Sequence, residues 1–401
     1  MRTGGRALIL WVGGLLIAAL AAHYGAKALH GHDFAAYHAA SRALLSGEGI
    51  YEVASAEGRP YSYPPALAVL LIPLALLPES AAAVLWVLLS LAFLLGALHL
   101  CARLVGGTLA RADRRVAMLA LLAVARPIDS ELANGQVNLL VLLCIALFAW
   151  LRMGERKSLS GAALGLATAL KATPALLLVY LLLKRDWRAL GAAIASLAFF
   201  LVALPAIPLG LHGALETNRI WVERYALPNL GVEGDAEEGP SGGGEAAQNG
   251  AEPARSVPRP HVAGHSLRAV VHRTFTWTVA STHSREPVFA NLVRWSPATA
   301  EWIYRALALL VVFGVAVTCR HAAPHSSSRS RWSLELSLFL TTMLLVSPIS
   351  RKAHFVILLL PFAFVAARIL REGDRRPLLW CIPAAALLNL TAPGIIGRPA
   401  S

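Results

Sequence analysis

The feature that most constrains this chain is the recurrence of long apolar segments along almost its whole length. Of its 401 residues, 57% are hydrophobic and 15% are charged, whereas soluble domains contain about 45–50% apolar and about 25% charged residues. A single anchor of about 20 residues could not raise the average so far in a chain of this length. The sequence excludes a soluble enzyme, a coiled coil and a disordered chain. It predicts an all-α polytopic integral membrane protein, one multi-pass domain over residues 1–401, with about 10 to 12 transmembrane or re-entrant helices.

Basic residues gather at the ends of the apolar segments. The net charge of +13 would suggest a nucleic-acid partner in a soluble protein, but here the clusters fit the positive-inside rule for cytoplasmic loops. We therefore expect membrane lipids and no nucleic acid as partners. The alternation makes residues 30–63 the first extracytoplasmic loop and residues 211–298 a large one. The Gly-rich, acidic insert at 231–260 is expected to be disordered, because its composition cannot bury enough apolar surface.

Two apolar stretches are too short or too interrupted for ordinary spans. Residues 64–78 number only 15 and begin Pro-Pro, which predicts an interfacial or re-entrant piece. The stretch between the basic clusters at Arg156 and Lys184 is interrupted by Lys171 and Pro174. Two half-helices meeting at Lys171 would return the chain to the same side and place this lysine at a tip that faces a cavity or the outside.

The other apolar stretches predict ordinary spans. These are expected at residues 8–29, 81–104, 116–128, 139–153, 189–209, 303–319, 334–349, 355–370 and 378–396. Short interfacial helices are expected at 221–230 and 266–277. The turn 350–354 is external by the same count although it contains Arg351 and Lys352, and a local exception to a regular charge pattern is a functional hint.

Neither a disulfide framework nor a metal site is predicted. The four cysteines lie in apolar segments or at their ends and lack CxxC spacing. His30 and His32 stand beside Asp33, but no second group of ligands follows at a fixed spacing. We expect no cofactor and no metal.

Several motifs occur in order between about residues 30 and 365. Asp33 follows the first apolar segment, a Gly-Gln-Val-Asn sequence opens another, and a glycine-rich stretch ends in Lys-Ala-Thr-Pro. The motifs are the segments Asp33–Gly47, Tyr61–Pro65, Gly135–Asn138, Gly161–Pro174 and Ser347–His354. As an ordered set they resemble glycosyltransferase family 87, which consists of bacterial membrane mannosyltransferases of the GT-C fold.

This resemblance implies transfer of a sugar, typically mannose, from a polyprenyl-phosphate donor to an acceptor hydroxyl. The acceptor would be a glycolipid, a polysaccharide or a protein, and the site would face the extracytoplasmic side of the bacterial inner membrane. Family members place an aspartate after the first helix as general base, and Asp33 is the residue that matches. Direct displacement at the anomeric carbon would invert its configuration. Donors of this monophosphate type are not expected to require a metal.

The remaining candidates would bind the donor phosphate or the sugar. Cations stabilise the charge that grows on a departing phosphate, and the candidates are His354, Arg351, Lys352, Arg273 and Lys171. Arg351 and Lys352 are equally compatible with headgroup snorkelling, whereas a lysine inside an apolar stretch usually lines a functional cavity. The substrate-binding candidates are Gln136, Asn138, Tyr37, Tyr61 and Tyr63. The amides could instead pair with neighbouring helices, and the tyrosines could belong to an interfacial aromatic belt.

The chain also departs from the family pattern. The last family motif usually contains a tryptophan and paired histidines, whereas this chain reads Ser-Arg-Lys-Ala-His at 350–354, and an Asn-Gln-Ser-Leu element is replaced by Gly-His-Ser-Leu at 264–267. Two other functions therefore stay open. One is a transporter or lipid flippase for an anionic substrate, which would predict inverted repeats that the hydropathy does not show. The other is a catalytically silent family member that acts as a lipid-binding scaffold.

Overall fold

The computed structural model describes residues 2–30, 33–105, 111–229, 264–277, 279–281, 288–289, 291–320 and 328–390. These residues are helical almost throughout, and among them a single antiparallel strand pair joins β1 (Val279–Ser281) to β2 (Val288–Phe289). In the first half the helices are α1 (Arg2–Leu29), α2 (Asp33–Ser46), α3 (Pro65–Leu70), α4 (Ile72–Ala75), α5 (Glu79–Leu104), α6 (Arg111–Ala123), α7 (Ala125–Asn134), α8 (Asn138–Met153), α9 (Lys157–Leu170), η1 (Thr173–Ala175) and α10 (Leu176–Leu183). In the second half they are α11 (Trp187–Ala198), η2 (Phe199–Ala203), α12 (Ala206–Trp221), η3 (Val222–Ala226), α13 (Leu227–Asn229), α14 (Leu267–Phe275), α15 (Pro297–Cys319), α16 (Ser328–Val346), η4 (Lys352–Leu358), α17 (Leu359–Glu372) and α18 (Leu378–Leu390).

The predicted all-α membrane class is confirmed. Among the described residues, four helical runs are long and apolar enough to cross a membrane: Glu79–Leu104, Trp187–Ala226, Pro297–Cys319 and Lys352–Glu372. Shorter apolar helices lie at Gly13–Leu29, Asn138–Met153, Thr173–Leu183 and Leu378–Leu390. Each of the eight overlaps a segment that the sequence predicts. The number of crossings and the GT-C topology stay predictions.

The two irregular stretches are divided into short helices, and their placement in the membrane stays a prediction. Residues 64–78 form the short helices α3 and α4. The stretch around Lys171 is divided into α9 and the η1–α10 pair, and Lys171 itself is extended, with φ −156° and ψ 130°. Pro174 lies in the first turn of the second piece, a position where its missing N–H costs no helical hydrogen bond.

The structure corrects the predicted span at 116–128, which is two helices. α6 ends at Ala123 and α7 begins at Ala125, because Val124 leaves helical geometry with φ −117° and ψ 22°. The side chain of Asn389 in α18 bridges this break: its Nδ2 donates to the Ala123 carbonyl at 2.9 Å and its Oδ1 accepts from the Arg126 N–H at 2.9 Å. Backbone groups released by the break are thereby satisfied.

The predicted extracytoplasmic segments contain more helix than their composition indicates. Residues 30–63 include α2, and the helical run after Trp187 continues past the predicted end at residue 209 to Asn229. Gly210 redirects this run with a φ of 69°, which glycine adopts without steric cost. The predicted interfacial helix at 266–277 is α14. The insert 231–260 and His32 lie outside the described residues.

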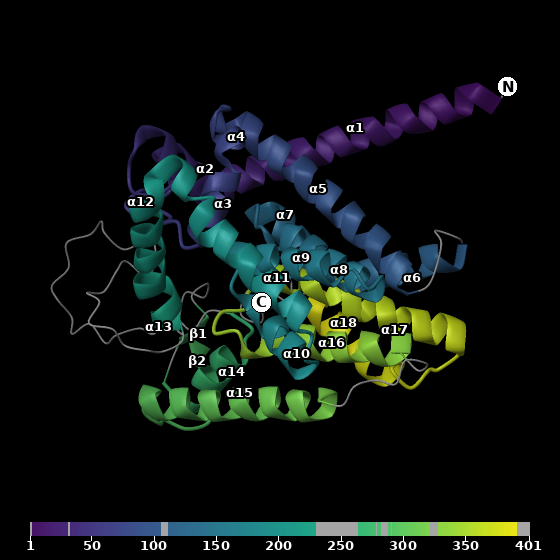
Figure 1. Cartoon of the computed structure of the whole chain (residues 1–401). Helices are drawn as coiled ribbons and strands as arrows, with labels where there is room; N and C mark the ends of the chain where they lie inside the picture. The colour runs from purple at the N-terminus through teal and green to yellow at the C-terminus, as the bar shows by residue number, and fades with distance from the viewer. Residues whose placement is uncertain are drawn as a thin grey trace.

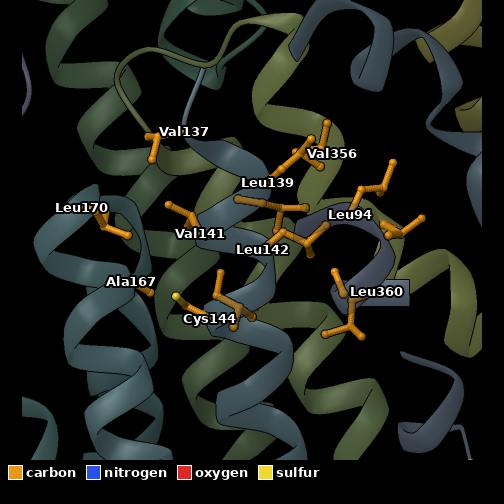
Figure 2. Close-up of a cluster of buried hydrophobic side chains, with 14 of the residues drawn as sticks. Leu94, Val137, Leu139, Val141, Leu142, Cys144, Ala167, Leu170, Val356 and Leu360 are labelled. Atoms are coloured by element: carbon orange, nitrogen blue, oxygen red, sulfur yellow. The ribbon is translucent and has the colours of Figure 1, made fainter. Parts of the chain in front are cut away.

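The core is centred on α8, which presents buried side chains on nearly all sides. Figure 2 shows Leu139, Val141, Leu142 and Cys144 of this helix in one cluster with buried side chains from α5, α9, η4 and α17. In Figure 1, α1 projects away from the helices around α8, and α15 lies along the opposite edge with α14 beside it.

Small residues allow α9 and α11 to pack backbone to backbone. A Cβ at Gly161 would lie 2.0 Å from the Ala189 carbonyl oxygen, and one at Gly165 would lie 2.4 Å from that of Ala193. This small-xxx-small pairing is the usual means by which membrane helices approach closely. It fixes the direction of α9 and therefore the position of Lys171 at its end.

Candidate functional site

Asp33 is the first residue of α2 and is held there by its neighbour. At the amino end of a helix a carboxylate is favoured by the helix dipole. The Phe34 ring is buried and stacks on Trp86 of α5, with the ring centroids 6.0 Å apart. Asp33 remains partly exposed. Apolar packing therefore fixes the helix start while the carboxylate stays accessible.

The turn before α8 is built around Gly135. This residue ends α7 in the left-handed conformation, with φ 61°, and its carbonyl accepts a 2.8 Å hydrogen bond from the Trp86 indole. A Cβ here would lie 2.6 Å from the Phe34 Cβ. Both the backbone angle and the close approach require glycine. The turn delivers the next residue, Gln136, to the start of α2.

A chain of hydrogen bonds connects Asp33 to Lys171 through two amides. The Gln136 Nε2 donates to the Asp33 Oδ2 at 2.6 Å, and the Asn138 Nδ2 donates to the Gln136 Oε1 at 2.7 Å. The Lys171 Nζ donates to the Asn138 Oδ1 at 2.6 Å. Gln136 and Asn138 are buried, whereas Asp33 and Lys171 are partly exposed. Four of the residues predicted from the sequence therefore meet in one network, with its charged groups at its two ends.

Glu131 is a fifth member of this network, and the sequence analysis missed it. The side chain is 1% exposed; its Oε2 accepts from the Asn138 Nδ2 at 2.7 Å and its Oε1 accepts from the Leu139 N–H at 3.1 Å. One signal was present, since an acidic residue stands between two apolar stretches shortly before the Gly-Gln-Val-Asn motif. Its meaning depends on the turn at Gly135, which folds α7 back onto the start of α8.

The turn at 350–354 brings further cations near this network. η4 packs against α7 and α8, and Lys171 is within electrostatic reach of Arg351. His354 is buried. Its ring Nδ1 accepts from the Arg351 backbone N–H at 3.3 Å, and its backbone N–H donates to the Arg351 carbonyl at 3.0 Å. The Arg351 side chain is exposed. His354 thus holds the turn that presents Arg351.

Lys352 and Arg273 are both within electrostatic reach of His265, which lies just before α14. The Arg273 Nε donates to the Ala269 carbonyl of its own helix at 3.2 Å. The His265 N–H donates to the Ser350 carbonyl at 2.6 Å, which docks the start of α14 on the turn. Partial burial of the His265 ring lowers its pKa, and the positive charges of Lys352 and Arg273 lower it further. Among the described residues, no hydrogen bond joins Arg273 to the Asp33 network.

The three candidate tyrosines differ in accessibility. Tyr37 and Tyr61 are fully buried, and the Tyr61 hydroxyl donates to the Pro64 carbonyl at 2.6 Å while it accepts from the Ala68 N–H at 3.2 Å. These two rings brace the segment that leads into α3. Tyr63 is partly exposed, packs edge-on against Tyr37 at 4.9 Å, and lies 5.9 Å below the Lys171 ammonium. Tyr63 is therefore the tyrosine that borders the network.

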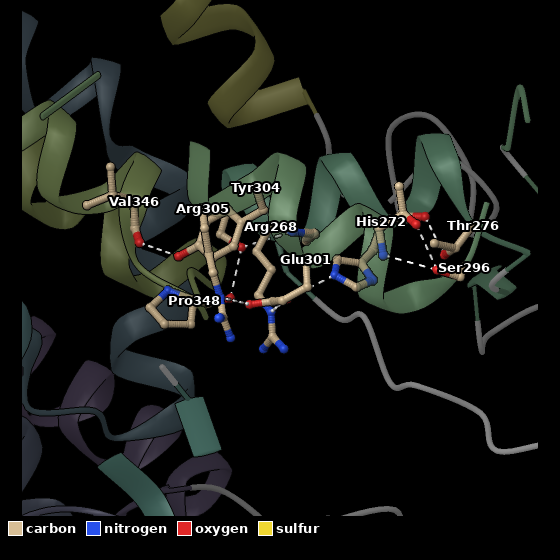
Figure 3. Close-up of polar contacts among 12 residues, drawn as sticks. Arg268, His272, Thr276, Ser296, Glu301, Tyr304, Arg305, Val346 and Pro348 are labelled. Carbon is tan, nitrogen blue, oxygen red and sulfur yellow. Dashed lines mark hydrogen bonds and ion pairs between the residues drawn. The ribbon is translucent and has the colours of Figure 1, made fainter. Parts of the chain in front are cut away.

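A separate ionic cluster fixes α14 to α15, as Figure 3 shows. Glu301 accepts from the Arg268 Nε at 2.8 Å and lies 3.1 Å from the His272 Nε2. The Tyr304 hydroxyl donates to the Val346 carbonyl at 2.7 Å. These contacts position α14 against the 347–354 turn and involve none of the side chains of the Asp33 network.

Two cavities open near α2 to α4. One of about 680 Å³ is lined by Arg42, Glu48 and neighbours on α2 and α4. The other, of about 450 Å³, is lined by apolar side chains only, including Leu67, Trp86 and Leu140. In the described parts of the chain, no group of three or more His, Cys, Asp or Glu side chains is placed to hold a metal ion. Independence from metal stays a prediction.

Comparison with known proteins confirms the resemblance that the motifs indicated. The family model of glycosyltransferase family 87 matches residues 61–231. A polyprenol-phosphate-mannose-dependent alpha-(1-2)-phosphatidylinositol pentamannoside mannosyltransferase of Mycobacterium tuberculosis is 37% identical over 147 residues, which are 36% of this chain and 32% of that protein. A polyprenol-phosphate-mannose-dependent alpha-(1-2)-phosphatidylinositol mannoside mannosyltransferase of the same species is 34% identical over 216 residues, 47% of this chain and 49% of the relative.

A third relative carries a different sugar in its name. An alpha-(1->3)-arabinofuranosyltransferase of Mycobacterium tuberculosis is 33% identical over 152 residues, 37% of this chain and 34% of the relative. The matches therefore span at most about half the length of these relatives. No solved structure matches the chain significantly.

Proposed function

We propose, from the match to glycosyltransferase family 87 over residues 61–231, that this protein is a membrane glycosyltransferase that uses a polyprenyl-phosphate sugar, with mannose as the sugar. The two mannosyltransferases described above have the highest identities quoted. Their names describe them as dependent on polyprenol-phosphate-mannose and as acting on phosphatidylinositol mannosides. By analogy, the acceptor hydroxyl belongs to a glycolipid. The arabinofuranosyltransferase is the reason to test the sugar directly.

The observation that carries this proposal is the hydrogen-bonded chain from Asp33 through Gln136 and Asn138 to Lys171. A transfer from a lipid phosphate requires a base for the acceptor and cations for the leaving group. Here a partly exposed carboxylate and a partly exposed ammonium lie at the two ends of one short network. Arg351 adds a second cation within electrostatic reach of Lys171.

The proposed step is a direct displacement. The acceptor O–H bond breaks and its proton passes to the Asp33 carboxylate, while the acceptor oxygen forms a bond to the anomeric carbon. The bond from that carbon to the phosphate oxygen breaks with its electron pair, which releases polyprenyl phosphate. Lys171 and Arg351 stabilise the negative charge that grows on this oxygen. A single attack from the opposite face inverts the anomeric centre, and no step uses a metal.

The apolar cavity supports a lipid-linked donor. Its wall includes Trp86, which holds the Gly135 turn, and Leu140, which follows the network residue Asn138 by two positions. A polyprenyl chain in this cavity would have its phosphate end close to the network. Burial of isoprenoid carbons contributes binding without hydrogen bonds.

The charge distribution supports an extracytoplasmic site in a bacterial inner membrane. Asn138 begins α8 and Arg152 lies near its end, which separates them by about 21 Å at the usual helical rise. Arg152, Lys157 and Lys184 mark the basic, cytoplasmic end by the positive-inside rule. The Asp33 network then lies toward the opposite face.

The test is a transfer assay in proteoliposomes with radiolabelled polyprenyl-phosphate mannose and a lipid extract as acceptor, repeated with the arabinofuranosyl donor. We expect mannolipid from the wild type and a loss of about 10²- to 10⁴-fold in Asp33→Asn. A folding check by size-exclusion chromatography and thermal unfolding accompanies both proteins. Equal transfer by the two proteins would remove Asp33 as base, and lipid movement without transfer would favour the flippase alternative.

A further inference from the structure

We propose that Glu131 is a positioning residue that sets the direction of every hydrogen bond between Lys171 and Asp33, and so turns the Gln136 amide nitrogen toward the base. The inference rests on the proposed function and adds to it a residue that lies outside the ordered motifs. It follows from which atoms can donate and which can only accept.

Lys171 and Glu131 together fix the orientation of the Asn138 amide. A lysine ammonium only donates, so the atom of Asn138 that faces Lys171 is its oxygen, at 2.6 Å. The Glu131 Oε1 accepts from the Leu139 N–H and its Oε2 accepts from the Asn138 nitrogen at 2.7 Å, so both oxygens of Glu131 act as acceptors here. Lys171 and Glu131 therefore demand the same orientation of this amide.

The orientation of the Asn138 amide determines the orientation of the Gln136 amide. The second hydrogen on the Asn138 nitrogen is donated to the Gln136 oxygen at 2.7 Å. The Gln136 nitrogen then points at the Asp33 Oδ2, at 2.6 Å. With either amide reversed, two donors or two acceptors would face each other in a buried site, which costs the desolvation of both groups.

The consequence for chemistry concerns the base. A hydrogen bond donated to an ionised carboxylate stabilises the charged form. Gln136 occupies one oxygen of Asp33, which leaves the other for the acceptor hydroxyl; in the described residues no second partner holds this carboxylate. Glu131 acts on Asp33 through the two amides that lie between them.

Glu131→Gln tests this directly, since it keeps the shape and removes the acceptor-only character. One side of the new amide is a donor that faces either the Asn138 nitrogen or the Leu139 N–H. We expect kcat of mannose transfer to fall about 10- to 100-fold, as for a misaligned catalytic group, with KM for the donor nearly unchanged. The matched control is Glu335→Gln, because Glu335 is also a buried carboxylate, 5% exposed, but pairs with Lys184 and Arg331 away from the network. It should keep the wild-type kcat.

A double-mutant cycle shows whether Glu131 acts through Gln136. In a Gln136→Ala background, Glu131→Gln should reduce kcat by less than about twofold further, because the link to Asp33 is already lost. Multiplied losses in the double variant would overturn the inference, since they would mean an effect that bypasses Gln136.

A second variant guards against misfolding. Glu131→Gln combined with Asn138→Asp moves the carboxylate to position 138, where it accepts from Lys171 and from the amide nitrogen introduced at position 131. The buried contacts are restored, but Gln136 must then donate to the carboxylate at position 138 and turn its oxygen toward Asp33. We expect wild-type thermal unfolding and an acid limb of kcat/KM moved up by about one pH unit or more, because the ionised base has lost its donor.

The outcomes separate the inference from the proposed function. The inference is supported by an active wild type, an impaired Glu131→Gln and a shifted pH profile in the swapped variant, which combines Glu131→Gln with Asn138→Asp. An active wild type with an unchanged Glu131→Gln, or an unshifted swapped variant, overturns the inference and leaves the transferase standing. A wild type inactive with every donor overturns both.

Discussion

The two ends of α8 stabilise buried carboxylates in different ways. At the carboxyl end, the Asp186 side chain lies 2.6 Å from the Arg152 Nη2 and 3.8 Å from the Lys157 Nζ. At the amino end, the donors to Glu131 among the described residues are neutral groups, the Asn138 amide and the Leu139 N–H. The exposed fractions are alike, 5% for Asp186 and 1% for Glu131.

The difference agrees with the proposal that the carboxyl end of α8 is structural and the amino end binds a ligand. Ion pairs with Arg152 and Lys157 neutralise the charge of Asp186. These pairs hold the loop between α10 and α11 against α8. A chain of amides transmits orientation while its terminal charges keep hydrogen-bonding capacity for a ligand. Lys171 uses one of its three donors on Asn138 in the described contacts. The predictions below test this division.

The largest effect is expected from the two lysines. Lys171→Ala removes the cation proposed to face the departing phosphate and should lower kcat/KM of transfer about 10²- to 10³-fold. Lys184→Ala breaks the 2.9 Å pair with Glu335 and should cost up to about 3 kcal/mol in the free energy of unfolding, the low end for a broken buried pair because Arg331 still faces Glu335. Transfer assays on the folded fraction, beside thermal unfolding, measure both.

If the two ends of α8 have separate roles, Lys171→Ala should reduce transfer without reducing stability. Lys184→Ala should reduce stability without reducing transfer by the folded protein. A Lys184→Ala protein that is folded yet inactive at low temperature would show that the carboxyl end of α8 also contributes to catalysis. A Lys171→Ala protein with full activity and a lowered melting temperature would make Lys171 a structural residue.

The glycines on either side of α8 should differ as well. Gly135→Ala forces a side chain into a left-handed backbone, at about 1–2 kcal/mol, and against Phe34, so both stability and transfer should fall. Gly154→Ala is the matched control, because Gly154 has a φ of −83° and a Cβ there meets carbonyl oxygens only at 3.6 and 3.7 Å. Thermal unfolding and transfer rate are measured on both. Equal behaviour of the two variants would contradict the role given to the Gly135 turn.

Much of this architecture is predictable from the sequence because membrane rules act locally. The length of residues 64–78, the interruption at Lys171 and the charge at the segment ends each report on a stretch of neighbouring residues. The break at Val124 was missed because the apolar run continues through it, and the Asn389 side chain that stabilises it comes from far along the chain.

The site was predictable only in part for the same reason. Asp33, Gln136, Asn138 and Lys171 belong to short motifs, and the fold does bring them together. Glu131 belongs to none of those motifs, and its importance comes from the turn that lays α7 beside α8. Burial of Tyr37 and Tyr61, and the distance of Arg273 from the network, depend on tertiary packing that no local pattern encodes.

The two cations of Asp186 should also differ, and the smallest effect is expected at Lys157. Arg152 is 24% exposed and close, so Arg152→Ala leaves a buried charge with one distant partner and should cost about 3 kcal/mol of stability. Lys157 is 43% exposed and 3.8 Å away, so Lys157→Ala should cost less than about 1 kcal/mol of stability. High salt should reduce the stability cost of Lys157→Ala but not that of Arg152→Ala. Urea unfolding at two salt concentrations measures both. Equal costs would mean that Asp186 is shared evenly, and a loss of transfer in either folded variant would end the functional contrast between the two ends of α8.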